Sequence, residues 1–411
     1  MAAPSLENWE MTAALSDLTA WLIQQGLENT PVETWLETLC VRLVEVGVPL
    51  HRVSVSMRAH HPEIGTVAFR WKRDVGNERE DFQRSTEAPE EYLHSPIYYL
   101  LGNNTEEIRQ RLNVPDPDLN FPIFDLFRDS GATDYFAAKR MFLREDHAAA
   151  IDPMKQEEGA VVTVTSDAPD GFSNVHLDAI RQLLPSICLM LKCAANRLMA
   201  EDITAAYMGR DASKRVLSGD ITRGSTETIH AVILYFDLQG FTKMSESLPG
   251  PAIIEMLNDY FAEAVEIVER HGGNVLKFMG DGMLAIFDMD QVPDARRVAI
   301  HAALDMRTAF APLNERRAKS GLATTGFTMG LHAGDVLYGN IGGKSRLDFT
   351  VIGPAVNTAS RMQGMCSAVD QTIVISAKVA KPLMDSVPEL VSLGQYRLRG
   401  VRERQELFTL D

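Results

Sequence analysis

The stretch GNVLKFMGDGMLAIF, residues 273–287, constrains the fold more than any other part of the sequence. Apolar residues alternate or run together on both sides of a Gly-Asp-Gly turn at 280–282, and this pattern favours a β-hairpin. Because side chains alternate across a strand, we expect Leu276 and Phe278 on one face and Lys277 on the other. The sequence therefore predicts a buried hairpin with an aspartate at its tip and a lysine that leaves the core side.

The size and charge of the chain limit what it can be. Its 411 residues are 45% apolar, which is enough for two or three domains with cores of their own. The formal charge is 40 − 56 = −16, so a nucleic acid or an anionic membrane surface would be repelled. We therefore expect neither as a partner. A small phosphorylated substrate is compatible if metal ions shield its charge.

The cysteines and the N-terminus favour a soluble, cytoplasmic protein. The four cysteines show no spacing typical of a disulfide framework or a zinc site. The first residues lack a basic region followed by an apolar run, and we expect no stretch that approaches the roughly 20 apolar residues of a membrane span.

The first half of the chain predicts a mixed α+β domain over residues 1–200. Two amphipathic helices are expected between about 8 and 48, and a long helix between about 175 and 199. Strands are expected at HRVSVSMR, GTVAFRWK, TDYFAAKRMF and GAVVTVTS. The charged region 77–118 is expected to be loop with a short helix near 105–112.

This order of elements and the ending VVTVTS followed by GFS resemble a GAF-like sensor domain. The resemblance implies a ligand or a protein signal whose identity the sequence does not give. The alternative is a domain that only scaffolds a dimer. Residues 201–226 are rich in Gly, Ser and charge and are expected to be a linker. The helix from Val175 to Met199 is expected to pair with its twin in a dimer, because its apolar residues recur at helical spacing.

The second half places two carboxylates at one edge of a sheet. A buried strand in IHAVILYFDLQGFT ends at Asp237, and a helix at about 251–271 leads to the hairpin with Asp281 at its tip. Two such carboxylates attract Mg²⁺ or Mn²⁺. The backbone N–H groups of Gly240, Phe241 and Thr242, in the turn after the strand, can point at phosphate oxygens. A helix at about 293–320 and a strand pair around the Ala-Gly-Asp of GFTMGLHAGDVLYGNIG follow.

The segment LDFTVIGPAVNTASRMQ, residues 347–363, adds two further polar groups. Its apolar strand is expected to end at Gly353, with Pro354 as the first residue of a helix. Asn357 and Arg361 then lie four apart on one helical face. Alone, such a pair is usually a solvated helix face. Beside a predicted metal site, the two residues are candidates for stabilising a transition state.

Four motifs together are similar to those of the class III adenylyl and guanylyl cyclase catalytic domain: FDLQGFT, GNVLKFMGDGMLAIF, GLHAGDVLYGNIG and FTVIGPAVNTASRM. The resemblance covers about 229–411 and implies a ferredoxin-like α/β domain that works as a dimer, with active sites at the subunit interface. The whole chain would then be α+β, with this catalytic domain at 227–411.

The resemblance also implies a role for each candidate residue. Asp237 and Asp281, with the carbonyl of Leu238, would bind two Mg²⁺ or Mn²⁺ ions. Asn357 would orient the ribose, and Arg361 would stabilise charge on the α-phosphate. Arg399, in the short motif YRLRGV, would contact the terminal phosphates. Because one chain carries the whole set, we expect a homodimer with two equivalent sites.

Lys277 and Thr350 fall where the family reads the purine. A lysine donates hydrogen bonds and cannot accept them, so it suits N1 of adenine rather than the N1–H of guanine, and the threonine hydroxyl can accept from the adenine amino group. Two residues depart from the family pattern, Gln239 for a frequent arginine and Pro354 for a frequent aspartate, and neither carries the metal or base chemistry. The sequence predicts an adenylate cyclase that converts ATP to cyclic AMP and pyrophosphate. The alternatives are a guanylyl cyclase and a silent nucleotide-binding or dimerisation module.

Overall fold

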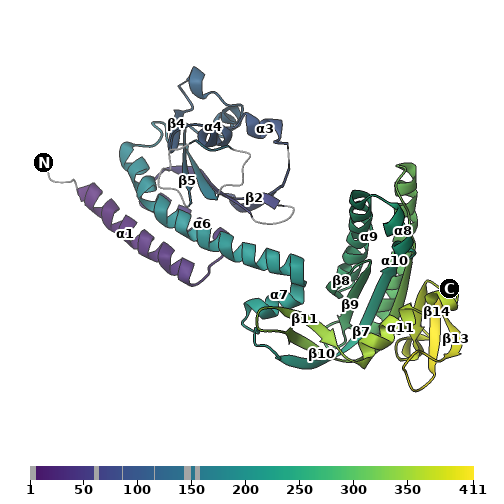
Figure 1. The fold of residues 1–411 in the computed structure, drawn as a ribbon. Coiled ribbons are helices and arrows are strands. Elements are labelled where there is room, and N and C mark those ends of the chain that lie inside the picture. The colour runs from purple at the N-terminus through teal and green to yellow at the C-terminus, as the bar shows by residue number, and fades with distance from the viewer. Residues whose placement is uncertain (1–5, 60–63, 86, 115, 143–149, 153–157) are drawn as a thin grey trace. The chain divides into compact units, whose positions relative to one another are not determined.

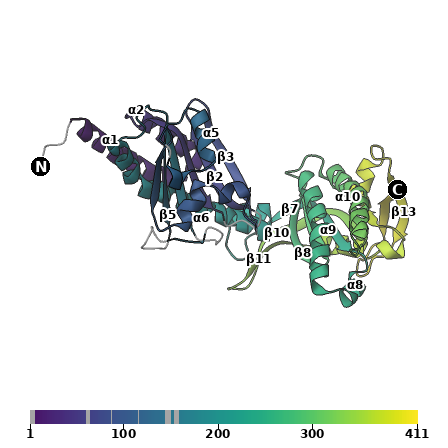
Figure 2. The same cartoon turned by 90° about the horizontal axis from the view of Figure 1, so that it is seen from above.

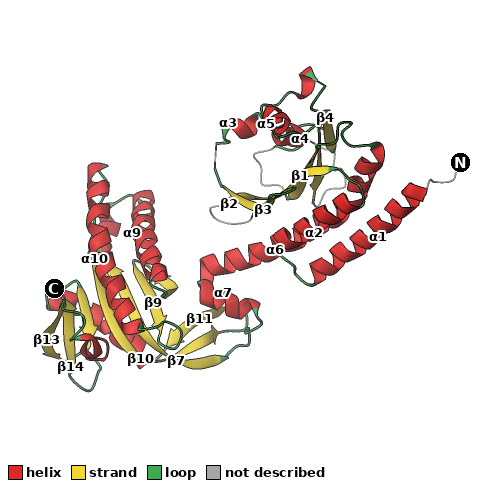
Figure 3. Ribbon diagram, turned by 180° about the vertical axis from the view of Figure 1, so that it is seen from behind, coloured by secondary structure: helices red, strands yellow, loops and turns green. Residues whose placement is uncertain are grey.

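The computed structural model describes residues 6–411, except 60–63, 86, 115, 143–149 and 153–157. The chain forms two compact units, Met1–Ile203 and Thr204–Asp411. Both combine a β-sheet with helices (Figure 1, Figure 3), so the predicted α+β fold class is confirmed. Each unit has its own hydrophobic core.

The first unit is built on a six-stranded antiparallel sheet with the order β3-β2-β1-β6-β5-β4. The strands are β1 Leu50–Arg58, β2 Ile64–Lys72, β3 Gly76–Gln83, β4 Glu107–Arg111, β5 Asp134–Met141 and β6 Gly159–Ser166. Four of them lie where the sequence predicts strands. The alternation of apolar and polar residues in β1 places Val53, Val55 and Met57 in the core.

Two hydrophobic clusters pack against this sheet. The larger one contains side chains of α1, α2 and α6, and the smaller one contains those of α4 and α5. The helices of the unit are α1 Leu6–Leu27, α2 Val32–Glu45, α3 Glu90–Leu93, α4 Pro96–Gly102, the 3₁₀ turn η1 Pro117–Leu119, α5 Ile123–Asp129 and α6 Asn174–Met208. The predicted pair of N-terminal helices is confirmed. The GAF-like resemblance stays a prediction.

The prediction for residues 77–118 was wrong, because the expected loop contains the helices α3 and α4 and two strands. Gly76–Gln83 is the edge strand β3, and Glu107–Arg111 is the strand β4 rather than a helix. Ile108 and Leu112 are buried, and a spacing of four puts two residues on one face of a helix and also of a strand. Pairing with β5 decides between the two.

Helix α6 carries the apolar row that we expected to pair with a twin helix. Leu177, Leu184 and Leu191 of that row are instead buried in the core of the first unit, because α6 packs on its sheet. Among the described residues, α6 is long and apolar enough to cross a membrane, judged by length and composition. A third of its most apolar 18-residue stretch is buried. The expectation that no stretch has this character was therefore wrong.

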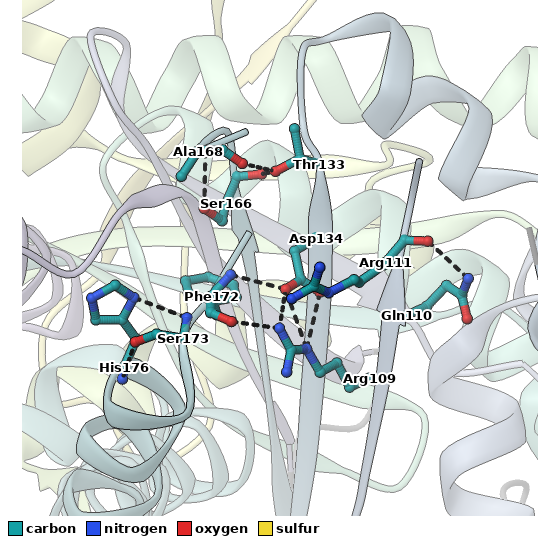
Figure 4. A network of polar contacts seen from close by, with 10 residues as sticks. All are labelled: Arg109, Gln110, Arg111, Thr133, Asp134, Ser166, Ala168, Phe172, Ser173 and His176. Carbon is teal, nitrogen blue, oxygen red and sulfur yellow. Dashed lines mark hydrogen bonds and ion pairs between the residues drawn. The ribbon is translucent and has the colours of Figure 1, made fainter. Parts of the chain in front are cut away.

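A buried ion pair joins the strands of the first unit to the start of α6 (Figure 4). Asp134 has no exposed surface, and its carboxylate accepts hydrogen bonds from Arg109, at 2.6 Å, and from the backbone N–H of Phe172, at 2.9 Å. Gly171 has φ +65°, and a Cβ there would collide with the Asp134 side chain. The network therefore fixes the loop before α6 against the sheet.

The second unit has an eight-stranded sheet with the order β13-β14-β12-β10-β7-β9-β8, and β11 pairs with β10. Its strands are β7 Thr226–Leu238, β8 Asn274–Met279, β9 Gly282–Asp288, β10 Phe327–Gly342, β11 Leu347–Ile352, β12 Ile373–Ser376, β13 Leu390–Tyr396 and β14 Gln405–Leu410. The strands β10, β7, β9 and β8 with the helices between them follow the βαββαβ order of a ferredoxin-like fold.

Helices cover both faces of this sheet. The long helices α9 and α10 lie side by side (Figure 1, Figure 2) and pack in one apolar cluster, whereas α7 and α11 contribute to a second. The helices of the unit are α7 Arg210–Leu217, α8 Phe241–Ser247, α9 Gly250–Arg270, α10 Ala295–Lys319, α11 Pro354–Gln363, α12 Ala377–Ala380 and the 3₁₀ turns η2 Cys366–Ala368 and η3 Lys381–Leu383. The residues 201–226 hold the end of α6, all of α7 and the start of β7.

Two local predictions in this unit were wrong. The strand β10 does not turn at Ala-Gly-Asp but runs on as one strand paired with β7. Gly334 is needed there because a Cβ would lie 2.8 Å from the Cβ of Ala355 in α11. In β8 the register shifts between Val275 and Lys277. This bulge breaks the alternation, so Leu276 is buried while Phe278 is half exposed and packs on Phe261.

Candidate active site

Two carboxylates meet at one edge of the sheet in the second unit. Asp237 is the second-last residue of β7, and it pairs in register with Gly282, the first residue of β9. Asp281 immediately precedes that glycine, and its carbonyl accepts a hydrogen bond of 3.2 Å from the N–H of Leu238. Gly280 turns the chain with φ +68°. The hairpin tip is therefore tied to the end of β7, as the sequence led us to expect.

The electrostatics of Asp237 distinguish it from an ordinary surface carboxylate. Burial and then the nearby charge of Asp281 raise the pKa of Asp237 to about 6, although a hydrogen bond from Gln363 opposes this effect. The Nε2 of Gln363 lies 3.3 Å from the Asp237 carboxylate and 2.8 Å from Oγ1 of Thr328. The ionised pair is thus short of positive charge, and a bound cation would stabilise it.

The donor atoms suit a magnesium or manganese ion that is shared with a substrate. The described residues include no cluster of three or more His, Cys, Asp or Glu side chains that could hold a metal by itself. Two carboxylates are nevertheless what Mg²⁺ commonly takes from a protein when phosphates supply further oxygens. Asp237 and Asp281 fit that set. The N–H of Leu238 joins it to Asp281, and its carbonyl stays a predicted ligand.

The turn after β7 leads into a short helix. Gly240 has φ +67° and precedes α8, which starts with Phe241. The Phe241 side chain packs against the core, and Thr242 is exposed. Gly240 thus lies three residues after Asp237. The backbone N–H groups predicted to contact phosphate therefore lie close in the chain to the carboxylate.

The structure pairs Lys277 with a residue that the sequence analysis did not name. Its Nζ lies 3.0 Å from the carboxylate of Asp348 on β11. Thr350 is two residues further along the same strand, so its side chain is on the same face as that of Asp348. The Oγ1 of Thr350 is buried and has no hydrogen-bond partner among the described residues. Lys277, Asp348 and Thr350 are together called the β8–β11 polar group below.

Asn357 and Arg361 are exposed on α11, which begins at Pro354 after Gly353 as predicted. The helix lies directly on β10 because Gly330 and Gly334 have no side chains to hold it away. Spacing of four residues puts the amide and the guanidinium on one face of α11.

Arg361 reaches toward the segment that contains Arg399. A Cβ placed on Gly400 would lie 3.3 Å from the guanidinium of Arg361. Arg399 is exposed and directly precedes that glycine. Two cationic side chains thus come from neighbouring parts of the fold, and such an arrangement favours an anion.

The predicted residues form two sets that do not touch within one chain. No hydrogen bond or ion pair among the described residues joins the carboxylates of Asp237 and Asp281 to the second set, which comprises Lys277, Thr350, Asn357 and Arg361. Sequence reasoning missed Asp348 and Gln363. The spacing of two between Asp348 and Thr350 could have revealed the first, whereas the second requires the packing of α11 on β7.

Comparison with known proteins identifies the second unit. Residues 225–411 match the model of the adenylate and guanylate cyclase catalytic domain. The chain is 38% identical over 178 residues to an adenylate cyclase of Anabaena cylindrica, covering 42% of this chain and 34% of that protein. It is 30% identical over 169 residues to adenylate cyclase 1 of Rhizobium meliloti, covering 41% and 25%. The chain thus spans about a third or less of the length of these relatives.

Among solved structures, the adenylyl cyclase CyaB from P. aeruginosa aligns with 46% of this chain and 96% of its own, at 26% identity and a TM-score of 0.43. The family model covers both adenylate and guanylate cyclases, so it establishes a cyclase domain and leaves the choice of base to the chemistry of the site. Residues 225–411 belong to the class III adenylyl and guanylyl cyclase catalytic domain family.

Proposed function

We propose that the second unit converts ATP to 3′,5′-cyclic AMP and pyrophosphate, and that the first unit regulates it. The observation that carries the proposal is the meeting of Asp237 and Asp281 at the sheet edge, where the pKa of Asp237 is raised to about 6. A carboxylate pair in this state binds a divalent cation readily. The adenylate cyclases of Anabaena cylindrica and Rhizobium meliloti support the reaction class.

In this reaction the protein mainly positions charged groups. Bound Mg²⁺ or Mn²⁺ supplies charge neutralisation on the triphosphate and lowers the pKa of the ribose 3′-hydroxyl. Asp237 and Asp281 hold the cations. Asn357 orients the ribose, and Arg361 and Arg399 stabilise the charge that develops as pyrophosphate leaves.

The β8–β11 polar group favours adenine. The ammonium of Lys277 can donate to N1 of adenine and would face the N1–H of guanine, which is also a donor. The hydroxyl of Thr350, buried without a partner, can accept from the adenine amino group. GTP is the second candidate because the Asp348 carboxylate, 3.0 Å from Lys277, can accept from the N1–H of guanine.

We further propose that two copies of the chain combine to make two equivalent sites in the cytoplasm. No hydrogen bond or ion pair among the described residues joins the carboxylate pair to the second set, which supports a role for a partner in bringing them together. Exposed apolar side chains are available for this contact: Leu337 and Ile352 are register partners on β10 and β11, and both are about half exposed. Leu189 and Tyr207 of α6 are also exposed, and they replace the buried row as candidates for pairing this helix with its twin.

The test is cyclic nucleotide production by the purified chain with ATP and with GTP, each in Mg²⁺ and in Mn²⁺. Asp281→Asn should lose the activity. Asp370→Asn is the matched control, since Asp370 is exposed, lies in the same unit, and has a positive φ that asparagine tolerates. Cyclic GTP as the main product would favour the second candidate. No product from either nucleotide, in the whole chain and in residues 204–411, would contradict a cyclase function.

A further inference from the structure

The first unit contains a pocket of about 460 Å³ that the cyclase reaction does not use. It lies around α4 and the segment before α5. The lining residues are Leu93, His94, Tyr98, Tyr99, Gly102, Asn103, Asn120, Phe121 and Pro122. Its volume is within the range of small-molecule sites, which is roughly 300–1,000 Å³. It is too small for a folded partner or an extended peptide.

Aromatic rings form much of the wall. Tyr99 and Phe121 meet edge to face with ring centroids 5.6 Å apart, and Phe121 contacts the buried Phe124 in the same way at 5.4 Å. Tyr98 is held edge to face by Tyr92 at 5.5 Å. Rings that support one another in this way keep their orientation, so flat apolar surfaces are presented to a ligand.

The polar side chains of the pocket are the imidazole of His94, two amides and two phenols. None of the described lining residues is an Asp, Glu, Lys or Arg. The side-chain N–H of Asn103 donates to the carbonyl of Tyr99 at 2.7 Å, which fixes the amide. Asn120 and the Tyr98 phenol make no hydrogen bond among the described residues and stay available. A cation that entered would lose water without gaining a counter-charge, because the described lining carries no carboxylate.

The pocket is held open by contacts behind it. The Nζ of Lys139, which is fully buried on β5, donates to the carbonyls of Leu100 at 3.0 Å and Asn103 at 2.9 Å. At the other end of α4, the hydroxyl of Ser95 caps the helix by accepting from the N–H of Tyr98 at 3.1 Å. Because both ends of α4 are fixed, the wall is preformed, as in most small-molecule sites.

We propose that this pocket binds a neutral, planar heteroaromatic molecule of one or two rings. Such a ligand would stack on the tyrosine and phenylalanine rings and form hydrogen bonds with the side chains of Asn120 and Tyr98. If the first unit regulates the second, as proposed above, this pocket is where its small-molecule signal would bind. Its binding is measured directly, so the test does not depend on whether the second unit is a cyclase.

The test uses ligand-observed NMR on the full chain with indole and quinoline as probes, beside benzoate as a charged ring and cyclohexanol as a neutral ring that is not planar. We expect Kd values on the order of 1 mM for indole or quinoline, as for good ligands of about ten atoms. Asn120→Trp should fill the pocket and weaken binding more than tenfold. Asn113→Trp, at an exposed asparagine of the same unit outside the lining, should leave binding unchanged.

A third variant separates stacking from simple apolar contact. Tyr98→Leu keeps an apolar side chain and removes a ring, so it should reduce the preference for indole over cyclohexanol. All four tryptophans of the natural chain lie in the first unit, so their fluorescence shows whether Tyr98→Leu and the asparagine variants remain folded. Equal binding to Asn120→Trp and to the natural chain would overturn the proposal. Absence of binding by both heteroaromatic probes, or a preference for benzoate, would also overturn it.

Discussion

Asp134 and Asp237 both lie at the end of a strand, one in each unit, and they differ in what surrounds them. The Asp134 carboxylate is fully buried but accepts hydrogen bonds from Arg109 and from the N–H of Phe172. Asp237 is partly buried, has the like charge of Asp281 beside it, and receives one hydrogen bond, from Gln363. A buried carboxylate that is paired with a cation and hydrogen-bonded, like Asp134, stabilises the fold. A carboxylate that lacks a cation marks a site for one.

The largest expected effects come from replacing each of the two carboxylates. Asp237→Asn should reduce cyclase activity about 10³-fold, because it removes about 4 kcal/mol of transition-state stabilisation. The fold should stay intact. Asp134→Asn should instead lower the free energy of unfolding of the first unit by about 3 to 5 kcal/mol, since Arg109 loses its counter-charge and keeps the Phe172 carbonyl as a neutral partner.

Urea unfolding followed by tryptophan fluorescence measures the effect on the first unit, because every tryptophan lies there. Asp125→Asn is the matched control, since Asp125 is an exposed partner of Arg128. The comparison fails if Asp237→Asn unfolds the protein or if Asp134→Asn costs no more than the control.

The next effect concerns His332, another buried polar group of the second unit whose Nδ1 has no partner among the described residues. Burial, and then the charge of Lys378, lower its pKa to about 4. The unfolded chain takes up this proton near pH 6.5 and the folded chain only near pH 4. The stability contribution is therefore present above pH 6.5 and is lost as the pH falls toward 4, by about 3 kcal/mol.

Hydrogen exchange of β10 peptides between pH 4 and 7, corrected for intrinsic rates, measures this loss. His332→Gln should flatten the dependence on pH. An unchanged pH dependence in the variant would assign the loss to another group.

A smaller effect is expected at Asp348. We expect it to hold the Lys277 ammonium in place for the base, so Asp348→Asn should raise the KM for ATP about tenfold, or 1.4 kcal/mol, with kcat less affected. Asp348→Glu should restore part of the affinity. The control is Asp335→Asn, which removes an exposed carboxylate paired with His230 on neighbouring strands. A change in kcat alone would show that Asp348 does not act through base binding.

The smallest expected effect comes from an exposed ion pair of the first unit, which is compared with the buried pair of Asp134. Arg181 of α6 forms two hydrogen bonds with Glu107 of β4, but both side chains are about one-third exposed. Arg181→Gln should therefore cost only about 1 kcal/mol or less, and the cost should shrink in high salt. Tryptophan fluorescence in urea measures it beside Asp134→Asn. A cost as large as that of Asp134→Asn would mean that burial does not decide the energy of these pairs.

The sequence by itself determined the local pieces of the active site. The glycines around Asp281 can adopt the positive φ that a tight turn requires, as Gly280 does at +68°. Gly353-Pro354 ends a strand and starts a helix, so Asn357 and Arg361 fall on one face. These signals lie within a few residues of what they control. The predicted order of strands and helices in the second unit was confirmed for the same reason, apart from the assumed turn in β10.

Only the tertiary structure decided the features that depend on pairing between distant segments. Residues 107–111 form a strand because β5 lies beside them, and β10 continues past Ala-Gly-Asp because it pairs with β7 from Phe327 to Gly339. The approach of Asp348 to Lys277 joins residues that are 71 apart in the chain. The bulge in β8 arises in its pairing with β9. Periods of two and of four residues cannot be told apart in a short segment, so the neighbouring strand, and not the local sequence, sets the outcome.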